Sequence, residues 1–416
     1  MGKKYIDYTW DFKKDNTKEF THCFHSYPAM MIPQVARRLI DKYGKKSKYL
    51  FDPYCGTGTS LVEANLKNIN AIGTDLNPLA RLIAKTKTNQ INLQTLDLYL
   101  KDFNDKLFSY RFGLRDSLSI VFPEFQNINY WFSKDVQLKL SIIKEYIEKI
   151  SDEAVQNFFK VAFSETVRES SWTKNSEFKL VRMSSIQLEK FQPDVFGIME
   201  FKLSRNKSGL ISYQNAKKNS ANTNVYEFNT VKGVPPDILP ENSVDLVVTS
   251  PPYGDSRTTV AYGQFSRLAN QWMGYSEASQ VDKILMGGVR NGKSKKFNSK
   301  ALNETIEKIQ KEDENRSRDV ISFFTEYEKS IKNISTTIKS GCYACYVVGN
   351  RSVKGFTIPT DEITKGLFVE NGFKHIETII RNIPNKRMPL ENSPSNVIGK
   401  KASTMRNEFI IVCQKI

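Results

Sequence analysis

The chain has 416 residues, of which 39% are hydrophobic and 25% charged, so it has the composition of a globular protein and the length for one large domain or two. A net charge of +16 favours a polyanionic partner, above all nucleic acid. No apolar run approaches the roughly eighteen residues of a membrane span, and the first residues lack the apolar core of a signal peptide. We therefore expect a cytoplasmic protein with no membrane contact.

Five cysteines are present, at positions 23, 55, 342, 345 and 413. An odd number lying mostly in apolar runs favours reduced thiols over disulfide bonds. Cys342 and Cys345 have the spacing of half a zinc site, but no second pair of ligands accompanies them and they lie in a strand pattern. We predict that both are buried and that the protein has no metal site.

The first 20 residues are polar and aromatic, and we expect them to form a loose arm. A loop with His25, Tyr27 and Pro28 follows. Apolar residues then recur at helical spacing from Met31 onward, which predicts a helix that ends at Gly44.

Residues 49–76 have the pattern of a compact β-α-β unit. The first strand leads through Gly56 and Gly58 into a helix, and the second strand ends at Asp75. Glycines permit a tight turn and a close approach of ligand to backbone, and an acid after the second strand can bind a ribose diol. The GxG spacing lacks both the third glycine of a dinucleotide site and the lysine of a phosphate loop, which argues against NAD and ATP. A purely structural turn remains the alternative.

Residues 86–223 are mainly helical in pattern and too long for an ordinary crossover, so we predict an inserted subdomain. Its second half mixes cations with amides and aromatics, among them Arg168, Lys202 and Arg205. Such a mixture suits phosphates and base edges. A solvated helical face is the alternative, because exposed lysines are common everywhere.

The apolar run 244–248 predicts a buried strand that ends at Ser250-Pro251-Pro252-Tyr253. The prolines cannot donate and hold the backbone extended, so Ser250 Oγ and the neighbouring carbonyls are fixed acceptors. Tyr253 adds a flat face. Acceptors beside an aromatic ring suit a planar base that carries an exocyclic amine. Alone, the run could equally be a strand-ending turn.

The segment after this strand is basic, and its glycine-rich part, residues 286–300, is predicted to be mobile and close to phosphate. Six cations are predicted to contact DNA: Arg257, Arg267, Arg290, Lys293, Lys295 and Lys296. Helices cover about 301–339, and further strands lie near residues 342, 373 and 408. Together with those near 49, 70, 224 and 244, seven strands are predicted.

The glycine motif DPYCGTG and the TSPPY motif together resemble the S-adenosylmethionine-dependent amino-methyltransferases of DNA, especially the N4-cytosine enzymes of restriction-modification systems. The resemblance covers the HSYP loop, the glycine turn, Asp75, SPPY and the closing strands. It implies an α/β fold with a Rossmann-like, seven-stranded methyltransferase sheet flanked by helices. It also implies S-adenosyl-L-methionine as cofactor, double-stranded DNA as substrate and a functional link to a cognate restriction endonuclease.

By this resemblance, the catalytic residues are Ser250, Pro251, Pro252 and Tyr253. The cofactor-binding residues are His25, Tyr27, Pro28, Asp52, Cys55, Gly56, Gly58, Thr59 and Asp75. The family usually holds the adenine of the cofactor with an acidic residue after the third strand, where this chain has Asn229 and Thr230.

The chain then divides into a first part of the methyltransferase domain at 1–85, the insert at 86–223 and the remainder at 224–416. The glycine motif comes first, but the insert precedes the third strand, so the usual classes of the family fit imperfectly. We interpret the insert as the target-recognition region.

Several alternatives stay open. A protein-methylating enzyme could have the same PPY motif, but the net charge of +16 favours nucleic acid. Serine before PPY is more typical of cytosine N4 than of adenine N6 methylation, but this rule has exceptions. An RNA amino-methyltransferase could use the same tetrad, although no aromatic RNA-binding motif occurs. A catalytically inactive DNA-binding module would not need the intact glycine and SPPY motifs.

Overall fold

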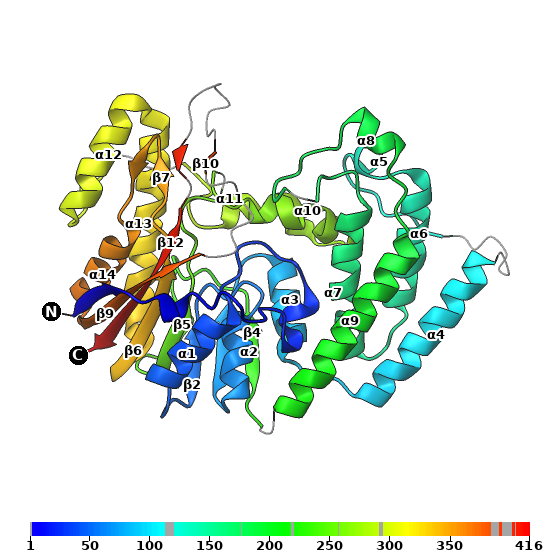
Figure 1. Cartoon of the computed structure of the whole chain (residues 1–416), viewed down its shortest axis with the longest axis horizontal. Coiled ribbons are helices and arrows are strands. Elements are labelled where there is room, and N and C mark those ends of the chain that lie inside the picture. The colour runs from blue at the N-terminus through cyan, green and yellow to red at the C-terminus, as the bar shows by residue number, and fades with distance from the viewer. Residues whose placement is uncertain are drawn as a thin grey trace.

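The computed structural model describes residues 2–112, 120–175, 177–217, 220–256, 258–290, 294–383, 391–392, 402–403 and 405–416. A sheet with its flanking helices forms one side of the molecule, and a group of helices forms the other (Figure 1). The main sheet has eight strands in the order β1-β9-β12-β6-β5-β2-β3-β4. Their bounds are β1 (Lys3–Ile6), β2 (Tyr49–Asp52), β3 (Asn70–Thr74), β4 (Thr223–Tyr226), β5 (Val244–Thr249), β6 (Ile338–Val348), β9 (Phe373–Asn382) and β12 (Asn407–Lys415).

All seven predicted strands are present in this sheet, and the predicted α/β methyltransferase fold is confirmed. β12 runs antiparallel to both of its neighbours, β6 and β9, whereas the other adjacent strands are parallel. Parallel strands end at the same edge of a sheet, so this arrangement gathers the loops that follow β2, β3, β4 and β5.

The eighth strand corrects the prediction of a loose N-terminal arm. β1 pairs in parallel with β9, from Lys3 opposite Glu377 to Ile6 opposite Ile380. Beyond it, the side chain of Trp10 is buried and the guanidinium of Arg38 lies 4.3 Å from its ring centre. All four residues of β1 are exposed, so the strand carries no alternating apolar pattern and is held by main-chain pairing, which sequence patterns do not reveal.

Helices cover both faces of the sheet. On one face, α1 (Pro33–Tyr43) and α2 (Thr59–Leu66) pack on Leu50 of β2 and Leu246 of β5. On the other, α12 (Lys300–Glu312), α13 (Glu314–Thr337) and α14 (Thr360–Glu370) pack on the neighbouring residues Phe51 and Val247. Successive residues of one strand thus enter opposite cores, as expected for a strand buried on both sides.

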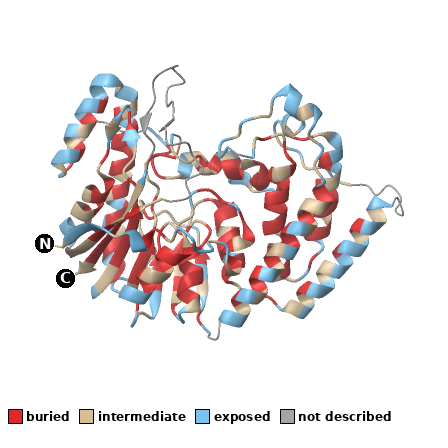
Figure 2. Ribbon diagram, viewed as in Figure 1, coloured by how far each residue is buried: buried red, intermediate tan, exposed pale blue. Residues whose placement is uncertain are grey.

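The predicted insert consists of helices between α3 (Pro78–Thr88) and β4. They are α4 (Leu93–Arg111), α5 (Ile128–Trp131), α6 (Lys134–Glu148), α7 (Glu153–Ser170), α8 (Ser185–Glu189) and α9 (Val195–Ala216). Their apolar core continues into α3 and into α10 (Tyr262–Trp272), the helix that follows the SPPY motif. In Figure 2, the buried residues of this core gather in α7 and α10, the helices of the group that lie nearest the sheet. Phe132 and Phe163 of the insert contact the buried ring of Trp272.

The five cysteines are free thiols. Cys345 is buried in β6 as predicted, but Cys342 of the same strand is only partly buried, which corrects the prediction for that residue. In the part of the chain that the structure describes, no three His, Cys, Asp or Glu side chains gather as metal ligands. Within the same residues, no helix combines the length and apolarity needed to cross a bilayer.

Candidate active site

The glycine motif and the SPPY motif meet at one edge of the sheet. β2 and β5 are adjacent and parallel, with Leu50 opposite Leu246 and Phe51 opposite Val247. The residues that follow each pair therefore leave the sheet side by side. A hydrogen bond joins them, because Thr249 Oγ1 donates to Asp52 Oδ1 at 2.5 Å.

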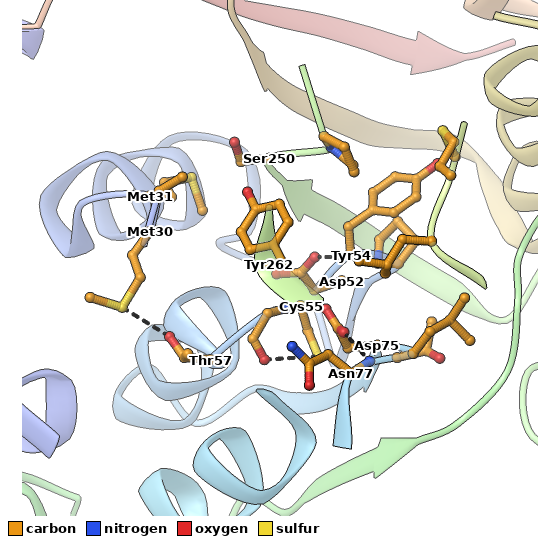
Figure 3. A pocket seen from close by; sticks show the side chains of 18 of the residues that line it. Met30, Met31, Asp52, Tyr54, Cys55, Thr57, Asp75, Asn77, Ser250 and Tyr262 are labelled. Atoms are coloured by element: carbon orange, nitrogen blue, oxygen red, sulfur yellow. Dashed lines mark hydrogen bonds between the residues drawn. The ribbon is translucent and has the colours of Figure 1, made fainter. Parts of the chain in front are cut away.

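A pocket opens at this edge (Figure 3). The predicted site residues that line it are Tyr27, Pro28, Asp52, Cys55, Gly56, Thr59, Asp75, Ser250 and Pro252. Asn229 and Thr230, at the expected place of the adenine contact, also line it. His25, Gly58, Pro251 and Tyr253 do not. One pocket thus brings together residues from loops more than 200 positions apart in the sequence.

The two glycines of the turn have different tasks. Gly56 has a φ of +49°, and a Cβ added there would meet no protein atom within 4 Å, so its bare backbone faces open pocket space. Gly58 has a φ of +78°, and its Cβ would lie 3.0 Å from the Cβ of Ala84 in α3. Gly58 therefore lets α2 and α3 pack closely behind the pocket rather than contacting a ligand.

Two carboxyl groups line the pocket, the buried Asp52 and the half-buried Asp75. Burial raises the pKa of Asp52 to about 6, although hydrogen bonds to its carboxylate oppose the shift. Burial also raises the pKa of Asp75 above its ordinary value. Asp75 Oδ2 accepts from the backbone N–H of Gly56 at 3.1 Å and Oδ1 from that of Asn77 at 2.7 Å, which fixes the carboxylate between the glycine turn and the start of α3.

The HSYP loop is held by the insert. The backbone N–H of Ser26 donates to Glu165 Oε1 of α7 at 2.7 Å, and Arg205 of α9 donates to Glu165 Oε2 at 2.6 Å and to the carbonyl of Phe24 at 2.8 Å. Burial opposes ionisation of Glu165, but neighbouring His25, Arg205 and Lys202 outweigh it and lower the pKa of this carboxyl to about 2. Glu165 is therefore an anion that fixes the loop.

Three cations for which the sequence suggested phosphate contacts bond within the protein instead; Arg168 and Lys202 are buried and Arg205 is half-buried. Lys202 and Arg205 pair with Glu165, and Arg168 is buried and donates to the carbonyls of Phe265 and Glu177. They lie on the inner faces of α7 and α9, and no feature of the sequence distinguished them from exposed cations.

His25 lies behind the pocket wall. Its ring is buried, packs against Tyr27 and Phe265, and has no hydrogen-bond partner among the described residues. Burial lowers the pKa of the imidazole to about 4, so it is neutral at physiological pH. Tyr27 stands in front of it and stacks on Tyr262 of α10, with ring centres 5.8 Å apart.

Sequence reasoning missed several residues that line the pocket. They include Met30, Tyr54, Asn77 and Phe228. Asn77 donates to the hydroxyl of Tyr27 at 2.8 Å and caps α3, and its Asn-Pro start was a recognisable helix signal. Phe228 follows β4, so the rule that ligands bind beyond the carboxyl ends of parallel strands could have found it. Nothing in the sequence marked Met30.

The SPPY motif is held by hydrogen bonds on the side away from the cofactor residues. Ser250 Oγ donates to the carbonyl of Val347 at 3.1 Å and lies 3.2 Å from the hydroxyl of Tyr253. That hydroxyl donates to Glu408 Oε1 at 3.1 Å. Ser250 is the member of the motif that lines the pocket from β5, and Pro252 lies beside it.

The predicted DNA contacts have varied surroundings. Arg257 and Lys293 lie outside the described residues. Arg290 pairs with the buried Asp319 at 2.7 Å, and Lys295 pairs with Glu328. Lys296 is exposed. Arg267 Nη2 lies 3.9 Å from Asp282 Oδ2.

The described part of the basic segment is packed rather than loose. The backbone N–H of Gly287 donates to Glu326 at 2.7 Å, and Phe297 is buried against the core under α12 and α13. The composition of the segment predicted mobility because glycine and lysine dominate it, but the buried ring of Phe297 and the hydrogen bond from Gly287 to Glu326 hold these parts in place.

Comparison with known proteins decides the family. A family model of N6/N4 methyltransferases, described as DNA methylase, matches residues 2–86. Over 423 residues the chain is 37% identical to the type II methyltransferase M.MvaI of Kocuria varians, covering 96% of this chain and 92% of that protein. The chain belongs to the type II DNA methyltransferases. The methyltransferase is therefore an amino-methylating DNA enzyme of a restriction-modification system, and its methyl donor is S-adenosyl-L-methionine.

Two further relatives are more distant. The type II methyltransferase M.BsoBI of Geobacillus stearothermophilus is 22% identical over 425 residues, which cover 87% of the methyltransferase and 80% of that protein. A tRNA (guanine(10)-N2)-dimethyltransferase of Methanothermobacter thermautotrophicus is 36% identical, but only over 64 residues that cover 15% of this chain and 18% of that protein.

The pocket fits this methyl donor. The bare backbone at Gly56 leaves room for a ligand, and the carboxylates of Asp52 and Asp75 are acceptors suited to hydroxyl and ammonium groups. Aromatic and thioether side chains such as Phe228 and Met286 offer an apolar wall for a purine ring.

Proposed function

We propose that the methyltransferase methylates the exocyclic N4 amine of cytosine in a specific sequence of double-stranded DNA and so protects that sequence from a cognate restriction endonuclease. The observation that carries the proposal is the place of Ser250, which lines the pocket one strand away from the glycine turn. A hydroxyl oxygen there can accept a hydrogen bond from a small amine presented at the mouth of the pocket.

For the cofactor, we assign the ribose hydroxyls to Asp75 and the methionine end to the turn around Gly56 and Thr59. Asp75 suits this part because its carboxylate is already aligned by two backbone donors and still faces the pocket. Asn229, which follows β4, replaces the usual acid near the adenine ring. When bound, S-adenosyl-L-methionine supplies an electrophilic methyl group on its sulfonium.

Around the substrate amine, the protein supplies acceptors and position. An aryl amine is a poor nucleophile because its lone pair is delocalised into the ring. Ser250 Oγ, in the pocket lining, and the carbonyl of the adjoining Pro251 accept hydrogen bonds from the two N–H groups and so favour a pyramidal nitrogen. Alignment of this nitrogen with the methyl group accounts for the larger share of the rate enhancement.

The target base has to leave the duplex to reach this edge, at a cost of a few kcal/mol. We propose that the ring of Tyr253, which is partly exposed, stacks on the extruded base and offsets this cost. The prolines before it fix the backbone, so the ring is presented without a large loss of conformational entropy.

We assign recognition of the DNA sequence to the insert. Arg182 lies there with its guanidinium 4.4 Å from the ring centre of Tyr130 and 4.9 Å from that of Trp172. Stacking holds the planar cation in one orientation, a property suited to bidentate contacts with guanine or phosphate. Lys174 and Lys179 of the same segment add positive charge.

The decisive experiment is expression of the methyltransferase in a bacterial host that lacks its own DNA methylation. Enzymatic digestion of the DNA to nucleosides and mass spectrometry should reveal N4-methylcytosine, and sequencing should place it within one recurring sequence. Recovery of N6-methyladenine alone would favour adenine as the target and overturn the cytosine assignment.

RNA is the second candidate, favoured by the short match to a tRNA methyltransferase. Incubation of the purified protein with tritiated methyl donor and either total tRNA or unmethylated plasmid DNA separates the two. We expect label in DNA, and label in tRNA alone would favour the alternative.

A further inference from the structure

A chain of hydrogen bonds connects the pocket to the far strands of the sheet. Ser250 Oγ lies 3.2 Å from the hydroxyl of Tyr253, which donates to Glu408 Oε1 of β12 at 3.1 Å. The other carboxylate oxygen of Glu408 accepts from Arg381 of β9. Arg381 is itself buried and donates through Nε to the carbonyl of Trp10 at 2.8 Å. Glu408 thus has one fixed orientation.

The charge of Glu408 decides the direction of the hydrogen bonds. A carboxylate only accepts, so the single proton of the Tyr253 hydroxyl points at Glu408. Burial and the nearby negative charge raise the pKa of this hydroxyl well above its ordinary value, so it stays protonated. The tyrosine oxygen can then only accept from Ser250. The proton of Ser250 is directed either to that oxygen or to the carbonyl of Val347, and in both cases its remaining lone pair is open to the pocket.

We propose that Glu408 is a positioning residue for methyl transfer, which keeps Ser250 an acceptor for the substrate amine by fixing the hydroxyl of Tyr253 as a donor away from it. The inference rests on the proposed role of Ser250, but it needs only an exocyclic amine and holds for cytosine and adenine alike.

A neutral side chain at position 408 should reverse the direction of the hydrogen bonds that involve the hydroxyl of Tyr253. In the variant Glu408→Gln, the carbonyl oxygen of the amide turns to the guanidinium of Arg381, because two donors would otherwise face each other. The amide N–H then donates to the oxygen of Tyr253. The tyrosine proton has Ser250 Oγ as its nearest remaining acceptor and occupies the lone pair that faces Tyr253. A hydroxyl oxygen that already accepts one hydrogen bond is a weaker acceptor for the substrate amine through its second lone pair.

The test measures kcat with unmethylated plasmid DNA and tritiated methyl donor at saturation. We expect Glu408→Gln to lower kcat by up to about tenfold through weakening of one hydrogen bond in the transition state, with KM for the methyl donor within twofold of wild type. In the Tyr253→Phe background, which lacks the hydroxyl, the same substitution should cause no further loss. A merely structural effect of Glu408→Gln would persist in that background.

Glu377→Gln is the matched control. Glu377 lies on the neighbouring strand β9 and also accepts from tyrosine hydroxyls, those of Tyr5 and Tyr43, but it is remote from the pocket. We expect it to keep the wild-type kcat. Equal losses in both glutamate variants, or a wild-type kcat in Glu408→Gln, would overturn the proposal.

Glu408→Gln could fail to fold because it leaves Arg381 buried beside a neutral group. The double variant Glu408→Met with Arg381→Met avoids this problem, since replacing a buried ion pair by apolar side chains often preserves stability. It also leaves Ser250 as the nearest acceptor for Tyr253. We expect the same loss, and a wild-type kcat here would refute the inference. A wild-type protein that transfers no methyl group to DNA would instead refute the proposed function.

Discussion

The cofactor edge of the sheet and the outer rim of the insert use charge in opposite ways. At the sheet edge, Asp52 is buried and Asp75 half-buried, and both act over short distances. In the insert, Arg182 is stacked on two aromatic rings and remains partly exposed. Buried charges are insensitive to salt and fix one small ligand, whereas exposed cations attract a long polyanion in a salt-dependent way.

This difference teaches how one chain can bind a small cationic methyl donor and a long polyanion independently. Substitutions at the sheet edge should alter binding of the methyl donor or kcat without altering the salt dependence of DNA binding. Substitutions at the rim of the insert should do the reverse. The shared core of α7, α9 and α10 is the connection through which the two parts keep their relative position.

The largest effect is expected for Asp75→Ala. In the proposed ribose contact, the carboxylate aligned by Gly56 and Asn77 contributes about 3 kcal/mol, so its loss should raise the Kd for S-adenosyl-L-methionine roughly 100-fold in calorimetry. DNA affinity should stay within twofold of wild type. Asp97→Ala, an exposed aspartate on α4, is the control. A reversed pattern, with DNA binding lost and donor binding kept, would contradict the separation of donor binding at the sheet edge from DNA binding at the insert.

Next comes Tyr253→Ala, which removes the aromatic face beside the pocket. Stacking on an extruded base contributes about 1–3 kcal/mol, so kcat/KM for DNA should fall by roughly 5- to 150-fold while the Kd for the methyl donor changes little. Steady-state assays on unmethylated plasmid give the first quantity and calorimetry the second. Unchanged turnover would speak against base extrusion onto this ring.

A smaller effect is expected for Arg182→Ala at the rim of the insert. Loss of one phosphate or base-edge contact should weaken DNA binding about 5- to 20-fold and, for a phosphate contact, lower the slope of log K against log salt by about 1. Fluorescence anisotropy across a salt titration measures both. Arg111→Ala is the control, because Arg111 lies on α4 and pairs with Glu200. An equal loss of DNA affinity in the control would mean that any positive charge of the insert strengthens DNA binding, whatever its position.

The smallest effect concerns stability. Lys87 is fully buried, with Nζ 3.4 Å from the hydroxyl of Thr57, and burial lowers the pKa of its amine to about 7 from an ordinary value of 10.5. Because the unfolded chain binds the proton more tightly, this group destabilises the fold below about pH 7, and the penalty fades as pH rises toward 10.5.

Lys87→Met should therefore be more stable than wild type at pH 7, by on the order of 1 kcal/mol, and the gain should shrink by pH 10. Thermal unfolding of both proteins at several pH values measures the difference. A gain that stays constant between pH 7 and pH 10 would mean that folding does not lower the pKa of this amine.

Much of the fold followed from local patterns. The seven predicted strands exist because runs such as 244–248 have apolar residues on both faces, and those patterns are legible in any sequence. β1 escaped prediction because Lys3–Ile6 buries no face of its own. Arg168, Lys202 and Arg205 were assigned to the surface because a cation gives no local sign of the carboxylate or carbonyl that it meets in the fold.

The residues of the active site likewise fall into those that the sequence predicted correctly and those that it did not. Residues at strand ends, such as Asp52, Asp75 and Ser250, were predicted and do line one pocket. His25 was placed in the site because it adjoins Tyr27 and Pro28, yet neighbours in a loop point to opposite sides, and its ring enters the core. Glu408 gave no signal at all, because its contact with Tyr253 joins residues 155 positions apart.

The sequence alone determined that two strand-end motifs exist and that their residue types suit a sulfonium cofactor and an amino-bearing base, because turn geometry and strand patterning are local properties of the chain. Only the tertiary structure decided that the two motifs stand on adjacent parallel strands, which cations are buried in ion pairs, and which distant carboxylate orients the tyrosine. Those outcomes depend on contacts between segments far apart in the chain, and such contacts are selected by packing of the whole molecule rather than by any short run of residues.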